Sequence, residues 1–153
     1  MSNEHIAERI AASAQKPRAR IAVAESLTSG ALASALGAAP DAAEWFAGGI
    51  VAYNSDVKHN LLRVSPGPVV RAGAAEEMAR AAREMFEATI AVAVTGAGGP
   101  AAQDDRPAGT VFIAVASGSG VSTSEFCFDG GPEQVVEQTV RHALRLLEGA
   151  LAA

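Results

Sequence analysis

Residues 89–95, TIAVAVT, form an unbroken apolar run about as long as one β-strand. A strand that lacks alternation of apolar and polar residues is covered on both faces, so helices must lie on both sides of its sheet. Residues 20–25, RIAVAE, have the pattern of a second buried strand. Residues 46–53, FAGGIVAY, indicate a third strand, in which the glycine pair allows a close backbone approach. Three such strands constrain the chain to a layered α/β fold.

Helical patterns separate these strands along the chain. The segment 28–37 is apolar almost all round, which predicts a helix buried against the sheet or against a partner subunit. In the segment 73–88, helical spacing places Met78, Ala82 and Met85 on the inward face. Helices are expected over residues 3–15, 28–37, 55–62 and 73–88 and from Pro132 onward.

The remaining pattern is a pair of strands near the C-terminus. Residues 109–117 and 120–128 are expected to pair as a hairpin across Gly118 and Ser119. Strands that alternate with helices and close with a hairpin indicate a mixed sheet. We therefore predict one domain over residues 1–153, a three-layer α/β/α sandwich with a mixed, mainly parallel sheet of about five strands.

Composition narrows the classes of function. Hydrophobic residues make up 49% of the chain and charged residues 19%, which disfavours disorder. The net charge of −5 and the lack of a basic stripe disfavour nucleic acid as a partner, and no apolar run reaches the length of a membrane span. Cys127 is the only cysteine and the N-terminal residues lack a signal-peptide pattern, so we expect a cytoplasmic protein. The three histidines lack ligand spacing, so no metal is expected.

Polar side chains follow three of the predicted strands at their carboxyl ends. They are Ser26, Tyr53 and Thr95, and parallel strands would bring all three to the edge of the sheet where ligands bind. Ser26 would sit on a strand-to-helix turn beside free N–H groups of the next helix, which suit an anion or an oxyanion. The alternative is that Ser26 or Thr28 only caps that helix.

Lys58 is the second candidate for chemistry. Ten of the twelve Lys and Arg residues are arginine, and Lys16 and Lys58 are the two lysines. A desolvated lysine can act as a base, whereas arginine cannot release its proton. The alternative is a lysine on a solvated helix face. Ser55 and Lys58 also form an S-x-x-K pattern, the spacing of a nucleophile and its base, but the chain lacks the accompanying S-D-N and K-T-G segments.

Residues 95–100, TGAGGP, form a glycine-rich turn after a strand, and its N–H groups could hold a phosphate. The turn is not a dinucleotide-binding fingerprint, because Ala101 stands where that fingerprint has glycine and Pro100 leads into a loop. No G-K-[ST] segment follows, so the chain has no P-loop. The irregular stretch 96–109 that contains this turn has a length typical of functional loops.

Four segments are informative through their sequence, their order and their spacing along the chain: AESLTSG (24–30), GGIVAYNSDVKHNLLRV (48–64), VTGAGGP (94–100) and RPAGTVFIAVA (106–116). Together they resemble the C-terminal domain of the competence/damage-inducible protein CinA, a family that includes nicotinamide-nucleotide amidases. The likeness covers about residues 5–150. It implies hydrolysis of nicotinamide mononucleotide to nicotinate mononucleotide and ammonia without a cofactor. It also implies that the protein is a homodimer and that it binds a small-molecule nucleotide as its substrate. No nucleic-acid or membrane partner is expected.

The resemblance also implies roles for individual residues. Ser26 would attack the amide carbon, and Lys58 or Tyr53 would take its proton. N–H groups at the start of the following helix would hold the oxyanion. The resemblance weakens the S-x-x-K interpretation, because the family commonly has another residue at position 55. The implied substrate-binding residues are Thr28, Ser29, Gly30, Thr95, Gly96 and Arg106.

This chain departs from the family pattern around the implied site. Leu27 and Ser29 replace a cysteine and a glycine, and Ala75 replaces a serine. Gly98 stands where alanine is usual, and Gly131–Pro132 replaces an acid and an arginine before the last helix. Loss of an arginine that binds phosphate would weaken a charge-assisted contact. Two alternatives therefore stay open: an amidase with a different substrate, and an inactive member that binds a nucleotide or a protein.

Overall fold

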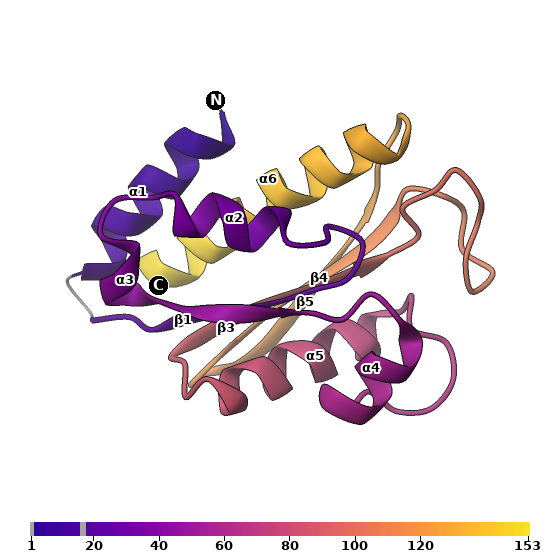
Figure 1. Cartoon of the computed structure of the whole chain (residues 1–153), viewed down its shortest axis with the longest axis horizontal. Coiled ribbons are helices and arrows are strands. Elements are labelled where there is room, and N and C mark those ends of the chain that lie inside the picture. The colour runs from indigo at the N-terminus through magenta and orange to yellow at the C-terminus, as the bar shows by residue number, and fades with distance from the viewer. Residues whose placement is uncertain (1, 16–17) are drawn as a thin grey trace.

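The computed structural model describes residues 2–15 and 18–153 and shows one sheet between two layers of helices (Figure 1). The predicted three-layer α/β/α sandwich is confirmed. The elements are α1 (Asn3–Gln15), β1 (Ile21–Glu25), α2 (Ala31–Gly37), α3 (Ala42–Trp45), β2 (Phe46–Val51), α4 (Ser55–Leu61), α5 (Ala72–Met85), β3 (Ile90–Gly96), β4 (Thr110–Ser117), β5 (Gly120–Cys127) and α6 (Pro132–Ala152).

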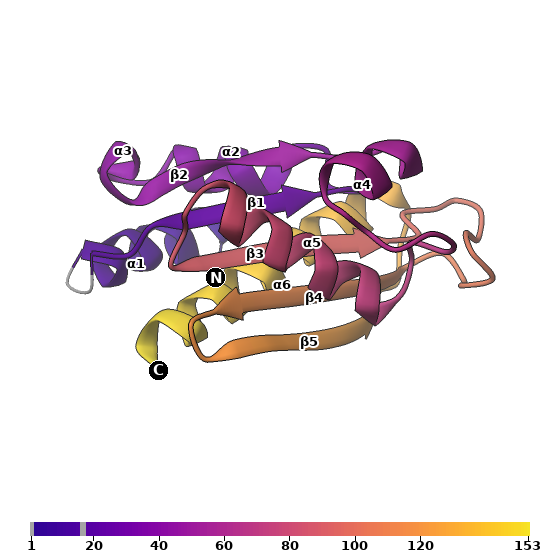
Figure 2. The same cartoon turned by 90° about the horizontal axis from the view of Figure 1, so that it is seen from below.

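The strand order in the sheet is β2-β1-β3-β4-β5 (Figure 2). β1 pairs in parallel with β2 and with β3, whereas β4 pairs antiparallel with β3 and with β5. Four strands therefore run in one direction and β4 runs against them, which confirms a mixed sheet. Ser117 pairs with Gly120, so the predicted hairpin turns through two residues as expected.

The two faces of the sheet carry side chains of different size. In β1, Ile21 and Val23 face α1, α2 and α6, whereas Ala22 and Ala24 face α5. β3 repeats the pattern, with Ile and Val on the first face and alanine on the second. α5 is itself rich in buried alanine, so the small side chains of the two elements pack together on this side.

The second predicted helix is shorter than expected. Residues 26–30 form turns, and α2 begins only at Ala31, because Ser29 and Gly30 have left-handed φ values of 49° and 103° that a helix cannot include. Its predicted all-round burial is wrong, since only Leu32 and Leu36 are buried.

The last turn of α5 also differs from the prediction. Met78 and Ala82 are buried as expected, but Met85 is 45% exposed. α5 ends at Met85, and the next residue, Phe86, packs against the alanine face of the core in its place. None of the described helices is long and apolar enough to cross a bilayer.

Gly49 in β2 allows the close approach that its sequence pattern predicts. A Cβ at Gly49 would overlap Val23 Cγ2 and lie 3.0 Å from the Val23 carbonyl oxygen. We expect Gly49→Ala to lower the free energy of unfolding by about 1–3 kcal/mol, as overpacking usually does. Gly149→Ala is the control, because nothing lies within 4 Å of a Cβ there and helix propensity should raise stability by about 0.5–1 kcal/mol. Equal stability of the two variants in urea unfolding would contradict this packing.

Candidate active site

The carboxyl ends of the three parallel strands meet at one edge of the sheet. Ser26 follows β1, Tyr53 follows β2, and Gly96 ends β3. A pocket of about 310 Å³ lies there, lined by Ser26, Leu27 and Tyr53 on one side and by Gly96 and residues 98–103 on the other. Loop 97–109 extends beyond the strand ends at this edge (Figure 2). The predicted convergence of Ser26, Tyr53 and the glycine-rich turn is therefore observed.

Ser26 has a free hydroxyl in this pocket. Ser26 is only 5% exposed, and its hydroxyl makes no hydrogen bond within the described chain. No fully buried side-chain nitrogen or oxygen among the described residues lacks a partner, so this hydroxyl must be open to the pocket. A capping serine would instead accept a backbone N–H of α2. The capping alternative for Ser26 is therefore wrong.

Glu25 holds the start of α2. Its fully buried carboxylate accepts a hydrogen bond from Thr28 Oγ1 at 2.6 Å, from the Leu32 N–H at 2.9 Å and from the Ala33 N–H at 2.9 Å. The Gly30 N–H also donates to it, at 3.3 Å. A carboxylate suits this position because it meets the free donors and the positive end of the helix dipole.

This role of Glu25 overturns two expectations. Thr28 does not cap α2, because its hydroxyl donates to Glu25 rather than accepting a backbone N–H. The α2 N–H groups that were expected to hold an oxyanion are already bound to the same carboxylate. The sequence signal that could have identified Glu25 is an acid at the end of an otherwise apolar strand, directly before the turn into a helix.

Other backbone donors line the pocket. The N–H groups of Leu27, Gly98 and Gly99 make no hydrogen bond within the part of the chain that the structure describes. Leu27 directly follows the serine, and the two glycines lie on the opposite wall. These three residues are therefore among those whose unpaired N–H groups could stabilise a developing oxyanion or hold an anionic substrate group.

Lys58 is buried and does not line the pocket, but it contacts Tyr53, which does. Lys58 is 1% exposed, and its Nζ donates to the Tyr53 carbonyl oxygen at 2.9 Å. Burial lowers the pKa of Lys58 from its usual value, and the Asp104 carboxylate opposes that shift. The solvated-face alternative is therefore wrong. A lysine with a lowered pKa has a larger neutral fraction near pH 7, which is the form that accepts a proton.

The second candidate base, Tyr53, has a different environment. It lines the pocket, but 68% of the residue is exposed. Burial or a neighbouring charge usually shifts the pKa of a general base. Of the two candidates, Lys58 is the one that is buried, and desolvation lowers its pKa. Ser55 is exposed and does not line the pocket, so the structure gives no support to the S-x-x-K pair.

The predicted substrate-binding residues are only partly brought together. Gly96 lines the pocket, whereas Thr95 is buried beneath it and donates to the Val69 carbonyl oxygen at 2.9 Å. The Arg106 guanidinium stacks over the Phe112 ring, 5.2 Å from its centroid. Arg106, Thr28, Ser29 and Gly30 are likewise not among the pocket-lining residues. Among the described lining residues there is no Lys, Arg or His.

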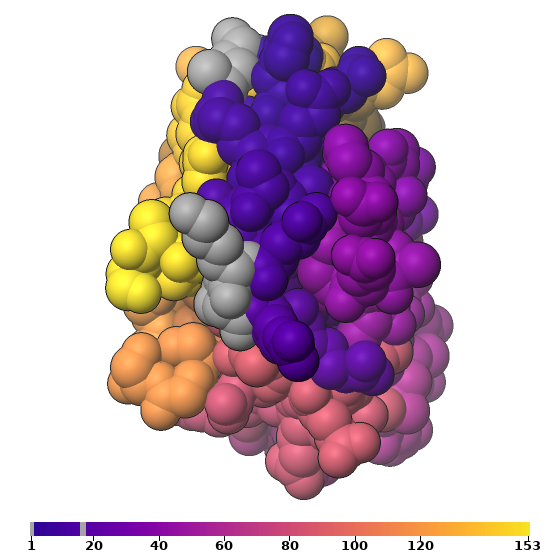
Figure 3. All heavy atoms as spheres, turned by 90° about the vertical axis from the view of Figure 1, so that its left-hand side faces the viewer, coloured from indigo at the N-terminus to yellow at the C-terminus, as the bar shows by residue number. Residues whose placement is uncertain are grey.

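Three larger hollows lie elsewhere on the described part of the chain, and the smallest of them, about 340 Å³, lies between the end of α1 and α3. The largest, of about 590 Å³, lies between the C-terminal end of α5 and the β4–β5 turn, on the end of the molecule that Figure 3 faces. The third, of about 510 Å³, lies between α1 and α2. None of the three contains a residue that the sequence motifs implicate in chemistry. The smaller pocket at the strand ends is therefore the candidate active site.

Comparison with known proteins adds family information. The sequence profile of the CinA C-terminal domain matches residues 3–151. A CinA-like protein from Solibacter usitatus is 37% identical over 139 residues, covering 87% of this chain and 33% of that protein. A CinA-like protein from Frankia casuarinae is 38% identical over 139 residues, covering 88% of this chain and 32% of that protein. The chain thus spans about a third of the length of these relatives.

Solved structures of similar chains agree over the whole fold. A competence-damaged protein (CinA) superfamily protein from Klebsiella pneumoniae has a TM-score of 0.95 at 32% identity, with 99% of both chains covered. The competence/damage inducible protein CihA from Agrobacterium tumefaciens has a TM-score of 0.92 at 31% identity, covering 99% of this chain and 96% of that one.

Proposed function

The chain belongs to the CinA C-terminal domain family, and we propose that it is an amidohydrolase that converts nicotinamide mononucleotide to nicotinate mononucleotide and ammonia. The observation that carries the proposal is the free Ser26 hydroxyl in a pocket at the strand ends. A serine on a strand-to-helix turn that neither caps the helix nor bonds elsewhere is available as a nucleophile. Buried Lys58, bonded to the backbone of the pocket residue Tyr53, supports the proposal as the proton acceptor.

In the first step, Ser26 Oγ forms a bond to the carboxamide carbon, and its proton passes through water to neutral Lys58. The carbonyl oxygen becomes an oxyanion, which the N–H groups of the lining residues Leu27, Gly98 and Gly99 would stabilise. The proton then returns to the amide nitrogen, the C–N bond breaks and ammonia leaves. Water attacks the resulting ester, releases the carboxylate and restores the Ser26 hydroxyl.

A second candidate is an amidase whose substrate carries no phosphate. No cationic side chain is found among the described lining residues, and Arg106 is stacked on Phe112. The phosphate of a nucleotide would then depend on backbone N–H groups such as those of Gly98 and Gly99. A nucleoside or free nicotinamide would not need such a contact.

Ammonia release from nicotinamide mononucleotide, nicotinamide riboside and nicotinamide tests both candidates. We expect release from the mononucleotide, with a lower kcat/KM for the two compounds that lack phosphate. A higher kcat/KM for the riboside would favour the second candidate. Release from none of the three would contradict both. In that case, a rise in the unfolding temperature on addition of the mononucleotide would indicate a protein that binds it without hydrolysing it. A ligand at 100 times its Kd adds about 2.7 kcal/mol to the free energy of unfolding.

A further inference from the structure

The irregular stretch at the pocket contains a tight turn. Within loop 97–109, the N–H of Gln103 donates to the Arg106 carbonyl at 3.0 Å, and the N–H of Arg106 donates back at 2.8 Å. The two residues between them, Asp104 and Asp105, have φ values of 52° and 62°. This is a two-residue hairpin turn of the kind that usually carries Asn-Gly, so two aspartates here adopt a conformation that costs energy.

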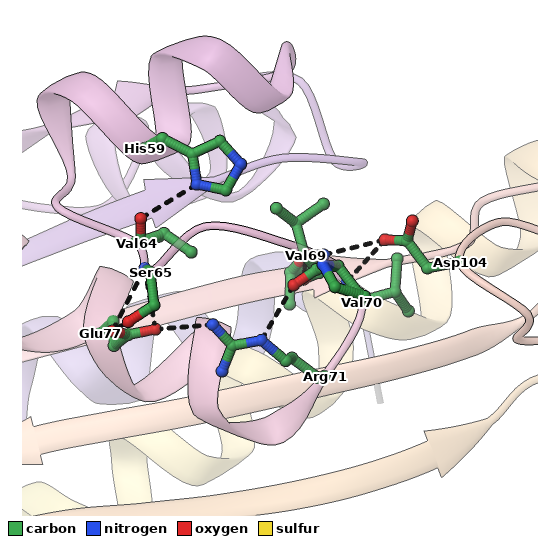
Figure 4. Close-up of polar contacts among 10 residues, drawn as sticks. His59, Val64, Ser65, Val69, Val70, Arg71, Glu77 and Asp104 are labelled. Carbon is green, nitrogen blue, oxygen red and sulfur yellow. Dashed lines mark hydrogen bonds and ion pairs between the residues drawn. The ribbon is translucent and has the colours of Figure 1, made fainter.

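The first of these aspartates bonds to a distant part of the chain. Asp104 Oδ2 accepts hydrogen bonds from the N–H groups of Val69 and Val70, at 2.9 and 3.0 Å (Figure 4). The Val69 carbonyl in turn accepts the hydroxyl of Thr95 at the end of β3. Asp104 therefore connects the loop that lines the pocket to the segment before α5, and through it to β3.

The same carboxylate acts on the buried lysine through space, because Lys58 Nζ bonds to the Tyr53 carbonyl and forms no ion pair among the described residues. Asp104 raises the pKa of Lys58 against the larger lowering that burial causes. Asp56 and His59 on α4, Arg71 before α5, and Asp105 and Arg106 on the loop are the other charged or titratable side chains of these packed segments. None of them is among the groups that shift the Lys58 pKa.

We propose that Asp104 is a positioning residue that fastens the pocket loop to residues 69–70, and that its charge, without contacting Lys58, also favours the buried ammonium. The link between Asp104 and catalysis rests on the proposed function, because Lys58 is the proton acceptor in that mechanism. The effect of Asp104 on the charge of Lys58 does not depend on the proposed function. The two parts can therefore be tested separately.

Asp104→Asn separates charge from shape. The variant keeps an oxygen that can accept the Val69 and Val70 N–H groups but removes the negative charge. Losing an attractive carboxylate disfavours the charged ammonium, so Lys58 should lose its proton at lower pH than in the wild type. Asp105→Asn is the matched control, because it removes the same charge from the next residue of the same turn. Asp104→Glu restores the charge and should restore the wild-type titration.

NMR with ¹³Cε-labelled lysine measures this titration directly. The chain has two lysines, so two signals are expected, and Lys16→Arg assigns them. We expect the Lys58 midpoint to move to lower pH in Asp104→Asn and to stay at the wild-type pH in Asp105→Asn and Asp104→Glu. An unchanged midpoint in Asp104→Asn, or an equal shift in Asp105→Asn, would overturn the effect of the Asp104 charge on Lys58.

Two further measurements complete the test. Amide hydrogen exchange at Val69 and Val70 should be faster in Asp104→Ala than in Asp105→Ala, and equal rates would overturn the fastening role. If the wild type hydrolyses an amide, the rise of kcat/KM with pH should begin at lower pH in Asp104→Asn, because neutral Lys58 is then present at lower pH. Absence of hydrolysis in the wild type would contradict the proposed function, while the NMR titration would still decide the role of Asp104.

Discussion

Replacing Ser26 with alanine is expected to lower kcat for amide hydrolysis by about 10⁴-fold or more, because the variant has no oxygen to form the covalent intermediate. Stability should change little, since the wild-type hydroxyl makes no hydrogen bond within the described chain. The measurement is ammonia release at saturating substrate, together with urea unfolding of the same preparations. A loss of activity without a loss of stability separates a nucleophile from a structural serine.

Ser34→Ala is the matched control for this experiment. Ser34 is an exposed residue of α2 outside the candidate pocket. Its replacement by alanine should leave both kcat and stability near wild-type values. If Ser26→Ala kept more than a tenth of the wild-type kcat, Ser26 would not be the nucleophile. If Ser26→Ala unfolded at much lower urea than Ser34→Ala, its role would be structural.

Glu25→Ala is expected to lower the free energy of unfolding by about 3–5 kcal/mol. The substitution leaves the Thr28 hydroxyl and the N–H groups of Leu32 and Ala33 without their acceptor in a buried site. Each unsatisfied buried donor costs about 1–3 kcal/mol. Glu25→Gln keeps one side-chain oxygen and should cost less than Glu25→Ala. Urea unfolding followed by circular dichroism measures these differences.

Glu8→Ala is the control for Glu25→Ala. Glu8 is exposed on α1 and makes no hydrogen bond or ion pair within the described chain, so its loss should change stability by less than about 0.5 kcal/mol. Glu25 also fixes the turn that carries Ser26, so Glu25→Gln should lower kcat even where the protein stays folded. Similar stability of Glu25→Ala and Glu8→Ala would show that the carboxylate does not hold α2.

The sequence by itself was enough to predict the fold class. Unbroken apolar runs and the Gly118–Ser119 turn are local signals, and they predicted strands and a hairpin that the structure confirms. The start of α6 at Pro132 was also predicted, because a residue that lacks an N–H suits the first turn of a helix. The convergence of Ser26 and Tyr53 was also predicted, because the carboxyl ends of parallel strands share one edge, but the order of the strands was not.

The tertiary structure decided which polar groups are free and which are occupied. Glu25 rather than Ser26 or Thr28 holds α2, because the left-handed residues Ser29 and Gly30 turn the chain so that the helix start meets the end of β1. Lys58 is buried rather than solvated, an outcome that the pattern of α4 alone left open. The Glu25 bonds are short-range but depend on the turn between β1 and α2, whereas the bonds from Asp104 to residues 69–70 join segments distant in sequence. Local periodicity fixes which face of an element is apolar, but hydrogen bonding and burial of single polar groups are settled only when the elements pack.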